Sequence, residues 1–365
     1  MKDNPLHIAV VIGSMRIGGA ERATLHLING LSKAGMKVEL VLLHRTGEFL
    51  ASVNKEIKII NLNKRKASHA VLVFGDYLKT NKPDLLFVVQ NHIQLMVLLA
   101  VKFSSWKGKI VLNEQSTFSK NLKGFKGNLQ KLLSKLLFEK ADKITVVSEG
   151  AAIDFGKQFP GLRSKIQIIP NAIVTEKLLK VKDQLIDHPF FNLGYKVIIA
   201  AGRLTKSKNF DLLLRAFELI YKKENAKLII LGDGEERQNL KILKNALRLK
   251  DDVSFPGFVS DPVKYFSKAD LFVLSSDYEG LPGVIIEALA CGCKIVSTNC
   301  ESGPAEILKN GELGWLTPVG DVKALADSIV IALNTQINKE LLIDRAMDYH
   351  EDKIIGKYMD LFNSL

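Results

Sequence analysis

The chain of 365 residues is 47% hydrophobic and 25% charged, a composition that excludes a disordered or fibrous protein and leaves room for two globular domains. Its charge is divided unevenly: residues 1–165 carry 26 Lys and Arg against 12 Asp and Glu, and the remainder carries 25 against 27. The basic first part indicates an anionic partner, such as phospholipid or nucleic acid, or alternatively a solvated lysine-rich face.

Neither a signal peptide nor a membrane span is expected. The first residues lack a basic region followed by an apolar run. The longest apolar stretch, residues 85–101, fits strand, turn and helix better than a bilayer span. It is interrupted by Gln90, Asn91, His92 and Gln94.

Three cysteines fall in one short segment, at Cys291, Cys293 and Cys300. The first two are too close for an ordinary disulfide, and no histidine cluster or second cysteine pair completes a zinc site. We therefore expect small core residues in a reducing compartment, and no metal site.

Short apolar strands alternate with helical segments through the first half of the chain. A strand at residues 7–12 is followed by a loop with Gly13, Gly18 and Gly19 and by an amphipathic helix that begins near Ala20. This alternation predicts a parallel, doubly wound sheet. Further strands are expected at residues 37–43, 57–62, 85–89, 109–112, 143–147 and 166–169.

The same alternation restarts after residues 180–193, a charged segment with little periodicity that marks a domain junction. The predicted fold class is therefore α/β, with two Rossmann-like domains at residues 1–178 and 179–350. Strands of the second domain are expected at residues 196–201, 227–231, 253–255, 271–274, 294–298 and 314–316.

The segment after the predicted strand at 271–274 carries candidate binding groups. A Gly-Leu-Pro-Gly turn there can present the N–H groups of Leu281, Gly283 and Val284 to an anion at a helix N-terminus, and a diphosphate fits such a site. Glu279 and Glu287 flank the turn and can accept hydrogen bonds from sugar or ribose hydroxyls. Alternatively, these are ordinary loop and helix-surface glutamates.

Two or three cations, Arg203 and Lys208 with Lys206 between them, follow the first predicted strand of the second domain. Arg203 can fork onto phosphate oxygens, and Lys208 can supply a point charge. Together they would neutralise a leaving diphosphate without a metal ion, whereas a plain basic surface loop is the alternative.

These motifs resemble the retaining glycosyltransferases of group 1, family 4, which have the two-domain GT-B architecture. In the first half, Gly-Gly-Ala-Glu-Arg at 18–22 matches, and the resemblance extends from residue 8 to about residue 330. The matching motifs of the second half are Gly-Arg-Leu at 202–204 with Lys208-Asn209, Gly-Asp-Gly at 232–234, Phe-Pro-Gly-Phe at 255–258, and the segment 279–292.

The resemblance implies an N-terminal acceptor domain and a C-terminal donor domain facing a central cleft, with a helix at 351–365 that crosses back onto the first domain. It implies that Arg203 and Lys208 hold the donor diphosphate, that Glu279 contacts the transferred sugar and that Glu287 binds the ribose. Asn171 matches the interdomain crossing. At Gly18 and Gly19 a Cβ would obstruct close approach to the donor phosphates, although a plain tight turn also explains this pair. The other donor-binding residues implied by the resemblance are Phe258, Gly280, Leu281, Pro282 and Gly283.

One departure concerns a histidine that many relatives carry at the end of the strand equivalent to 109–112. Here the sequence reads Asn-Glu-Gln-Ser, so Glu114 could take that role, or His92 after the strand at 85–89 could contribute. The catalytic base is therefore left open between these two residues.

The implied reaction moves a hexose or N-acetylhexosamine from a nucleotide diphosphate donor, UDP-linked by resemblance, to a lipid-linked saccharide or polysaccharide acceptor, with retention and without cofactor or metal. The alternatives are a nucleotide-sugar epimerase or sugar-phosphate synthase of the same architecture, or a non-catalytic nucleotide-binding homologue. An NAD enzyme is disfavoured because the spacing from Gly13 to Gly19 does not match Gly-x-Gly-x-x-Gly.

Residues 119–143 interleave lysines with leucines and phenylalanines, which predicts a basic amphipathic helix. We expect it to contact an anionic membrane surface, placing the protein in the cytoplasm, peripheral on the inner face of the cytoplasmic membrane, with no nucleic-acid partner. The alternative is a helix packed on its own sheet with a solvated lysine rim. The lysines predicted to contact lipid are Lys123, Lys126, Lys131 and Lys135.

Overall fold

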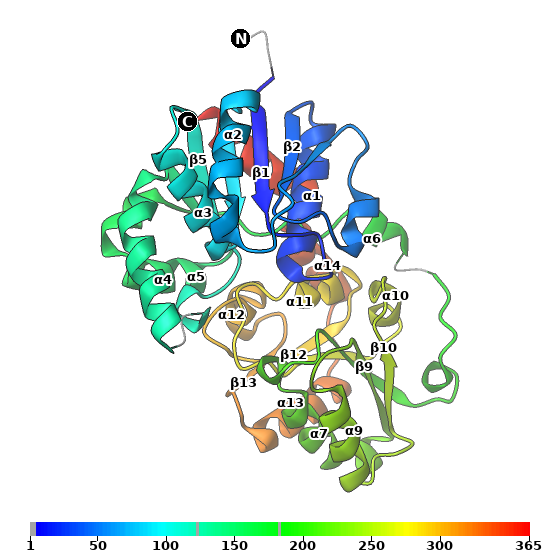
Figure 1. The fold of residues 1–365 in the computed structure, drawn as a ribbon. Coiled ribbons are helices and arrows are strands. Elements are labelled where there is room, and N and C mark those ends of the chain that lie inside the picture. Colours follow the sequence, from blue (N-terminus) through cyan, green and yellow to red (C-terminus); the bar gives the residue numbers. More distant parts are fainter. Residues whose placement is uncertain (1–4, 122–123, 182–183) are drawn as a thin grey trace. The chain divides into compact units, whose positions relative to one another are not determined.

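The computed structural model describes residues 5–121, 124–181 and 184–365, which form two compact units (Figure 1). The first unit comprises the chain up to Ala172 together with Glu351–Leu365, and the second comprises Ile173–His350. Residues 173–178, which the sequence analysis assigns to the first domain, belong to the second unit. The first two residues of this segment are held in the second unit, because the backbone N–H groups of Ile173 and Val174 both donate to the carbonyl of Tyr349.

The first unit contains a seven-stranded sheet in the order β3-β2-β1-β4-β5-β6-β7, in which every pair is parallel. The central strands are continuous apolar runs with buried side chains, as expected for a parallel sheet covered on both faces. The strands are β1 (His7–Ile12), β2 (Lys37–Leu42), β3 (Lys58–Asn61), β4 (Leu85–Val89), β5 (Lys109–Glu114), β6 (Lys143–Val146) and β7 (Ile166–Ile168).

The strand order of this sheet reverses between β1 and β4, which places the connecting helices on opposite faces. The C-terminal helix α15, drawn in red among the blue elements in Figure 1, packs against α1. The helices are α1 (Gly19–Lys33), α2 (Val71–Asn81), α3 (Asn91–Lys102), α4 (Gly124–Leu137), α5 (Glu149–Gln158) and α15 (Glu351–Asn363), with short 3-10 helices at Glu48–Ser52, Ala67–Ala70, Phe118–Asn121, Phe138–Lys140 and Pro160–Lys165.

Aromatic packing anchors α15 in the first unit. The ring of Tyr358 meets that of Phe87 on β4 edge to face, with 5.5 Å between centroids, and Phe362 meets the same ring at 5.9 Å. A Cβ on Gly30 of α1 would lie 2.6 Å from Ile355, so the glycine allows the two helices to approach closely. The last residues of the chain are therefore part of the first unit's core.

The second unit repeats the architecture with six parallel strands in the order β10-β9-β8-β11-β12-β13. Its core lies between this sheet and its helices, with Phe210 and Phe217 of α7 buried. The strands are β8 (Lys196–Ala201), β9 (Ala226–Leu231), β10 (Val253–Gly257), β11 (Leu271–Leu274), β12 (Lys294–Thr298) and β13 (Trp315–Thr317). The helices are α6 (Glu176–Val181), α7 (Phe210–Glu218), α8 (Tyr221–Glu224), α9 (Arg237–Ala246), α10 (Val263–Phe266), α11 (Gly283–Ala290), α12 (Pro304–Ile307), α13 (Val322–Asn334) and α14 (Lys339–Met347), with 3-10 helices at Pro189–Phe191, Lys206–Lys208 and Lys309–Gly311.

The prediction of two Rossmann-like domains is confirmed, and each predicted strand is present within two residues of its expected ends. The three cysteines form no disulfide in the described part of the chain, and Cys293 and Cys300 are buried. Burial raises the pKa of Cys300 to about 12, which keeps its thiol protonated. In the described part of the chain, the helices are all too short or too polar to cross a bilayer.

Candidate active site

The second unit brings a lysine and a glutamate together at the carboxyl edge of its sheet. Lys208 Nζ lies 2.5 Å from Glu279 Oε1, and the same oxygen accepts a hydrogen bond of 2.6 Å from the hydroxyl of Ser276. The side chains of Lys208 and Glu279 are only 23% and 11% exposed. Glu279 is therefore not an ordinary solvated loop residue, because its carboxylate is paired with the ammonium group of Lys208 in partly buried surroundings.

Two loops are locked together around this pair. The hydroxyl of Ser275 donates to the carbonyl of Lys208 at 2.9 Å, and the N–H of Asp277 donates to the carbonyl of Ser207 at 2.8 Å. Asn209 has a left-handed backbone with φ of 46°, and its amide donates to the carboxylate of Asp277 at 2.7 Å. The loop after β8 and the loop after β11 are therefore fixed to each other, which holds the lysine over the glutamate.

Arg203 lies apart from this pair. Its guanidinium is 3.4 Å from the carboxylate of Glu235, and the two side chains are 74% and 56% exposed. Its loop is nevertheless well fixed, because Leu204 exchanges backbone hydrogen bonds with Asp233 and Glu236. Arg203 and Lys208 thus follow the same strand without sharing a partner among the described residues.

Steric limits require both glycines of the Gly-Asp-Gly motif after β9. Gly232 has a φ of +137°, and a Cβ there would lie 1.9 Å from the carbonyl oxygen of Gly202. A Cβ on Gly234 would lie 2.4 Å from the carbonyl oxygen of Leu204. The glycines therefore allow the loop after β9 to lie against the loop that carries Arg203.

The turn before α11 is supported from the loop after β12. Gly280, Leu281 and Pro282 are buried, while Gly283 at the start of α11 is half-buried. The hydroxyl of Ser302 donates to the carbonyl of Gly280 at 2.8 Å. The helix leaves its first N–H groups without intrahelical acceptors, as any helix does, and its dipole favours an anion at this end.

Two other predicted donor residues differ in burial. Glu287 lies on α11 and is 6% exposed, so it is a buried helix residue and not a surface one. Phe258 follows β10 and is 49% exposed. Sequence reasoning missed Ser276 and Ser302, although a Ser-Gly-Pro run after a predicted strand is a signal for this same edge of the sheet.

The glycine loop of the first unit is shaped by Glu21. Gly18 is extended, with φ of −174°, and a Cβ on it would lie 2.2 Å from Glu21 Oε2, whereas a Cβ on Gly19 would meet open space. Gln90 accepts from the N–H of Gly13 at 3.2 Å and donates to Glu21 at 2.8 Å. Burial raises the pKa of Glu21. The absence of a side chain at position 18 therefore makes room for this carboxyl group.

Glu114 and His92 lie at the ends of neighbouring strands. Glu114 is the last residue of β5 and is 5% exposed, and burial raises its pKa to about 8. His92 is in the first turn of α3, where its side chain is exposed. Both belong to the carboxyl edge of the sheet, where open α/β folds bind ligands.

Comparison with known proteins agrees with this geometry. The family described as Glycosyl transferases group 1 matches residues 181–348, and Glycosyltransferase Family 4 matches residues 17–177. The N-acetylgalactosamine-N,N'-diacetylbacillosaminyl-diphospho-undecaprenol 4-alpha-N-acetylgalactosaminyltransferase of Campylobacter jejuni is 31% identical over 335 residues, covering 87% of each chain. This chain belongs to the group 1 glycosyltransferases. These matches therefore confirm the family resemblance that the sequence motifs indicated.

Other similar proteins support the same assignment. An uncharacterized glycosyltransferase of Haemophilus influenzae is 30% identical over 358 residues, covering 93% of this chain and 95% of its own. Among solved structures, Anabaena HepE in complex with UDP and glucose matches with a TM-score of 0.82 over 99% of this chain and 100% of that chain. At 18% identity this likeness establishes the GT-B fold that the transferase shares.

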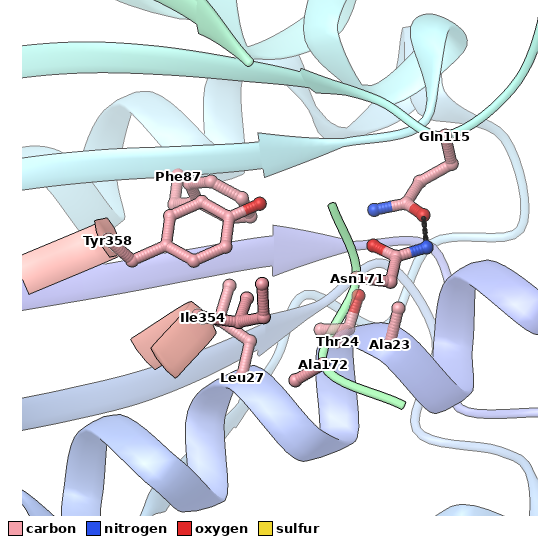
Figure 2. Close-up of a pocket in the computed structure, with 9 residues that line it drawn as sticks. All are labelled: Ala23, Thr24, Leu27, Phe87, Gln115, Asn171, Ala172, Ile354 and Tyr358. Carbon is pink, nitrogen blue, oxygen red and sulfur yellow. Dashed lines mark hydrogen bonds between the residues drawn. The ribbon is translucent and has the colours of Figure 1, made fainter. Parts of the chain in front are cut away.

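The first unit of the transferase also encloses a small cavity beside the chain crossing, shown in Figure 2. Its volume of about 10 Å³ suits a single water molecule at most, so it is no substrate site. Figure 2 shows Gln115 and Asn171 facing each other, and the amide of Asn171 donates to Gln115 Oε1 at 2.8 Å. The residue predicted at the interdomain crossing is thus held by the residue after Glu114. The cavity is lined by Ala23, Thr24, Leu27, Phe87, Gln115, Asn171, Ala172, Ile354 and Tyr358.

Helix α4 of the transferase exposes leucines and buries polar groups. Leu129, Leu132 and Leu136 recur at steps of three and four residues and are 48%, 56% and 65% exposed. On the inward face, Ser134 is fully buried and Gln130 donates from its amide to the side-chain oxygen of Asn91. These three leucines therefore lie on the outside of the unit, although Leu137 at the end of the same helix is buried.

The lysines predicted to contact lipid differ in their surroundings. Lys135 is exposed, and Lys131 donates to Gln158 Oε1 at 2.7 Å. Lys126 belongs to the first turn of α4, and Lys123 lies outside the described residues. Lys135 thus extends into solvent beside the exposed leucines, which lie on the same helix.

Proposed function

We propose that the transferase moves a hexose or N-acetylhexosamine from a UDP-linked donor to a lipid-linked saccharide acceptor, with retention of configuration. The observation that carries this proposal is the Lys208–Glu279 pair beside the start of α11 at the ligand-binding edge of the second unit. The Campylobacter relative is named as a transferase of N-acetylgalactosamine to a diphospho-undecaprenol saccharide. The solved relative from Anabaena was crystallised with UDP and glucose.

The donor site supplies positive potential where negative charge develops. As the bond between sugar and diphosphate lengthens, Lys208 and Arg203 balance the charge of the leaving group, and the first N–H groups of α11 do the same. No metal ion is required in this scheme, because the cations come from the protein. Preorganised charges of this kind act without having to reorient during the reaction.

The carboxylates of the site bind hydroxyl groups in this proposal. Glu279 accepts hydrogen bonds from the transferred sugar, and Glu287 accepts them from the ribose. Glu279 is already oriented by Lys208 and Ser276, so it meets the sugar in a fixed position. The other donor contacts are proposed for Gly18, Gly19, Phe258, Gly280, Leu281, Pro282 and Gly283.

Helix α4 supports the proposal of a membrane-held acceptor. Its exposed leucines offer apolar surface, and its lysines offer charges of the sign that attracts anionic phospholipid. We infer that the transferase works as a peripheral protein on the inner face of the cytoplasmic membrane, where a lipid-linked acceptor is found beside a soluble nucleotide-sugar pool. Nucleic acid is not proposed as a partner.

A donor screen followed by product analysis tests the function. A nucleotide that binds the native state raises the apparent melting temperature, and we expect UDP to do so and Lys208→Met to abolish the effect. With an undecaprenyl-diphosphate saccharide present, the product should keep the anomeric configuration of the donor sugar, as read by NMR. An isomerised sugar formed from donor alone would indicate an epimerase, a sugar phosphate formed with a phosphorylated acceptor would indicate a synthase, and binding without turnover would indicate a non-catalytic homologue.

A further inference from the structure

Buried polar atoms surround Glu114 at the end of β5. Its Oε1, the side-chain oxygen of Gln94 and the side-chain nitrogen of Asn91 are shielded from solvent, and none of the three has a hydrogen-bond partner among the described residues. Gln94 and Asn91, on the first turn of α3, are the hydrogen-bonding neighbours of this carboxyl group. A buried polar atom without a partner costs free energy, so these atoms require a further account.

The orientation of the Gln94 amide is fixed by two carbonyl groups. Its nitrogen donates to Val88 O at 3.4 Å and to Asn113 O at 3.1 Å. Turning the amide over would point its oxygen at both carbonyls, so the oxygen must face the other way. Gln94 therefore presents an acceptor toward a carboxyl group that, when ionised, is also only an acceptor.

The charges near Glu114 do not favour a carboxylate. The charged group that acts on it is Asp154 of α5, which is negative and accepts from the N–H of Ser119 at 3.0 Å. On α4 the ammonium group of Lys131 is directed to Gln158, and on α3 the side chain of His92 is exposed. In the part of the chain that the structure describes, Glu114 forms no ion pair, and a lone buried carboxylate is strongly disfavoured.

We propose that Glu114 is held as a neutral acid whose O–H donates to Gln94 Oε1, and that it acts as a positioning residue for the first turn of α3. One proton then satisfies both buried oxygens, and the carbonyl oxygen of the acid is left to accept from Asn91 Nδ2. Burial, the largest effect, raises the pKa of Glu114 to about 8 although its amide neighbours Gln94 and Asn91 lower it, and this net direction agrees with the assignment.

The position of this turn matters because it connects three parts of the first unit. Gln90 has a left-handed backbone with φ of +71° and bridges Gly13 and Glu21 in the glycine loop. Asn91 accepts from Gln130 of α4. The protonated Glu114 therefore fixes the turn that links the glycine loop to the proposed membrane helix. This role in transfer rests on the proposed function, whereas the protonation of Glu114 does not.

Glu114→Gln and Glu114→Ala separate positioning from direct participation in the reaction. A glutamine supplies an N–H donor of the same shape, so it should restore most of the activity at pH 7 that alanine loses. In the wild type, kcat/KM should fall about fivefold between pH 8 and pH 9 as the acid ionises, and this fall should be absent in the glutamine variant. A glutamine variant that is as inactive as the alanine variant, but fully folded, would overturn the positioning role.

Thermal unfolding against pH tests the protonation without any transfer assay. Between the ordinary pKa of glutamate and about 8, the folded chain keeps a proton that the unfolded chain loses. Wild-type stability should therefore fall relative to Glu114→Gln as pH rises from 5 to 8, and the difference should be constant above that range. A difference that stays constant from pH 5 to 8 would contradict the neutral acid. Glu139→Gln, which removes an exposed carboxyl group from the same unit, is the control.

An infrared measurement keeps the test decisive if the variants do not fold. The folded chain at pH 7 should show the C=O absorption of a protonated carboxyl group, and this band should disappear with a midpoint near pH 8. Recording it in Glu21→Gln as well excludes Glu21, another carboxyl group whose pKa is raised by burial. Absence of the band at pH 7 would overturn the proposal.

Discussion

Lys208 Nζ lies 2.5 Å from Glu279 Oε1 although 71 positions separate them in the sequence. Removing one member of a largely buried ion pair leaves an uncompensated charge, whereas removing both charges together costs far less stability. Single and double variants can therefore distinguish what this pair does for folding from what it does for transfer.

Lys208→Met should lower both stability and activity. We expect the free energy of unfolding to fall by about 2–4 kcal/mol, because Glu279 loses its cation in partly buried surroundings. The double variant Lys208→Met with Glu279→Gln should regain most of this stability, while kcat/KM stays roughly 100-fold or more below wild type because no ammonium group faces the leaving diphosphate. Urea unfolding and initial rates measure the two effects.

The control for this cycle is Lys206→Met, which removes an exposed lysine from the same turn. It should leave stability and kcat/KM close to wild type. A double variant that recovers both stability and turnover would show that the pair is purely structural.

The strands could be predicted from the sequence because their information is local. A run of apolar residues bounded by turn residues is enough to locate β8 (Lys196–Ala201) or β11 (Leu271–Leu274). A strand of a parallel sheet that is buried on both faces has such a continuous apolar run. The partner of a particular charge depends on contacts between distant segments. The motifs therefore identified Lys208 and Glu279 as candidates without showing that they pair, and gave no indication that Arg203 meets Glu235.

Two further features of the site were beyond sequence reasoning for the same reason. The spacing of leucines in α4 (Gly124–Leu137) fits a buried stripe or an exposed one equally well, and only the packing shows that Leu137 is buried while Leu136 is 65% exposed. The glycine at position 18 was explained by an approaching ligand, whereas its nearest neighbour is the carboxyl group of Glu21.

Arg203→Ala should reduce transfer without destabilising the fold. The ion pair with Glu235 is exposed, and such pairs contribute at most about 1 kcal/mol. Loss of a preorganised charge at the leaving group should lower kcat/KM by roughly 100-fold, whereas Glu235→Ala should have little effect. If Arg203→Ala and Lys208→Met both turn over like the wild type, the donor site lies elsewhere.

Gly232→Ala should destabilise the second unit well beyond the usual effect of a left-handed alanine. A Cβ at this position would lie 1.9 Å from the carbonyl oxygen of Gly202, so the backbone of two loops must move. We expect a loss of more than about 3 kcal/mol, measured by urea unfolding. Gly320→Ala is the matched control, because its φ of +79° is also left-handed but a Cβ there meets open space; it should cost only about 1–2 kcal/mol. Equal losses in the two variants would contradict the steric argument.

Transfer activity should survive chelation. In the proposed mechanism Lys208, Arg203 and the start of α11 supply the positive potential that a metal ion supplies in other transferases. Rates measured after dialysis against EDTA should therefore match those measured with added Mg²⁺ or Mn²⁺. Complete loss of activity in EDTA that either ion restores would reject this part of the proposal.

Binding to vesicles should depend on the exposed face of α4. Leu129, Leu132 and Leu136 expose apolar surface that water penalises by roughly 25 cal/mol per Å², so replacing all three with glutamine should weaken lipid binding. Leu341→Gln is the matched control, because that leucine is 54% exposed on α14 of the second unit. It should leave vesicle binding unchanged if the contact belongs to α4.

The lysines of the same helix should provide the dependence on lipid charge. Each lysine near an anionic surface contributes about 1 kcal/mol, and salt screens the attraction, so changing Lys123, Lys126, Lys131 and Lys135 to glutamine should lower the affinity for anionic vesicles by roughly 100-fold or more. Lys135 should account for a larger share than Lys131, because the ammonium group of Lys131 is engaged by Gln158 and that of Lys135 is exposed. Co-sedimentation with vesicles at low and high salt measures both effects. Equal binding of the wild type to neutral and anionic vesicles would exclude a role for the lysines, because the leucines alone would not distinguish the two lipids. No binding to anionic vesicles would exclude the membrane contact itself.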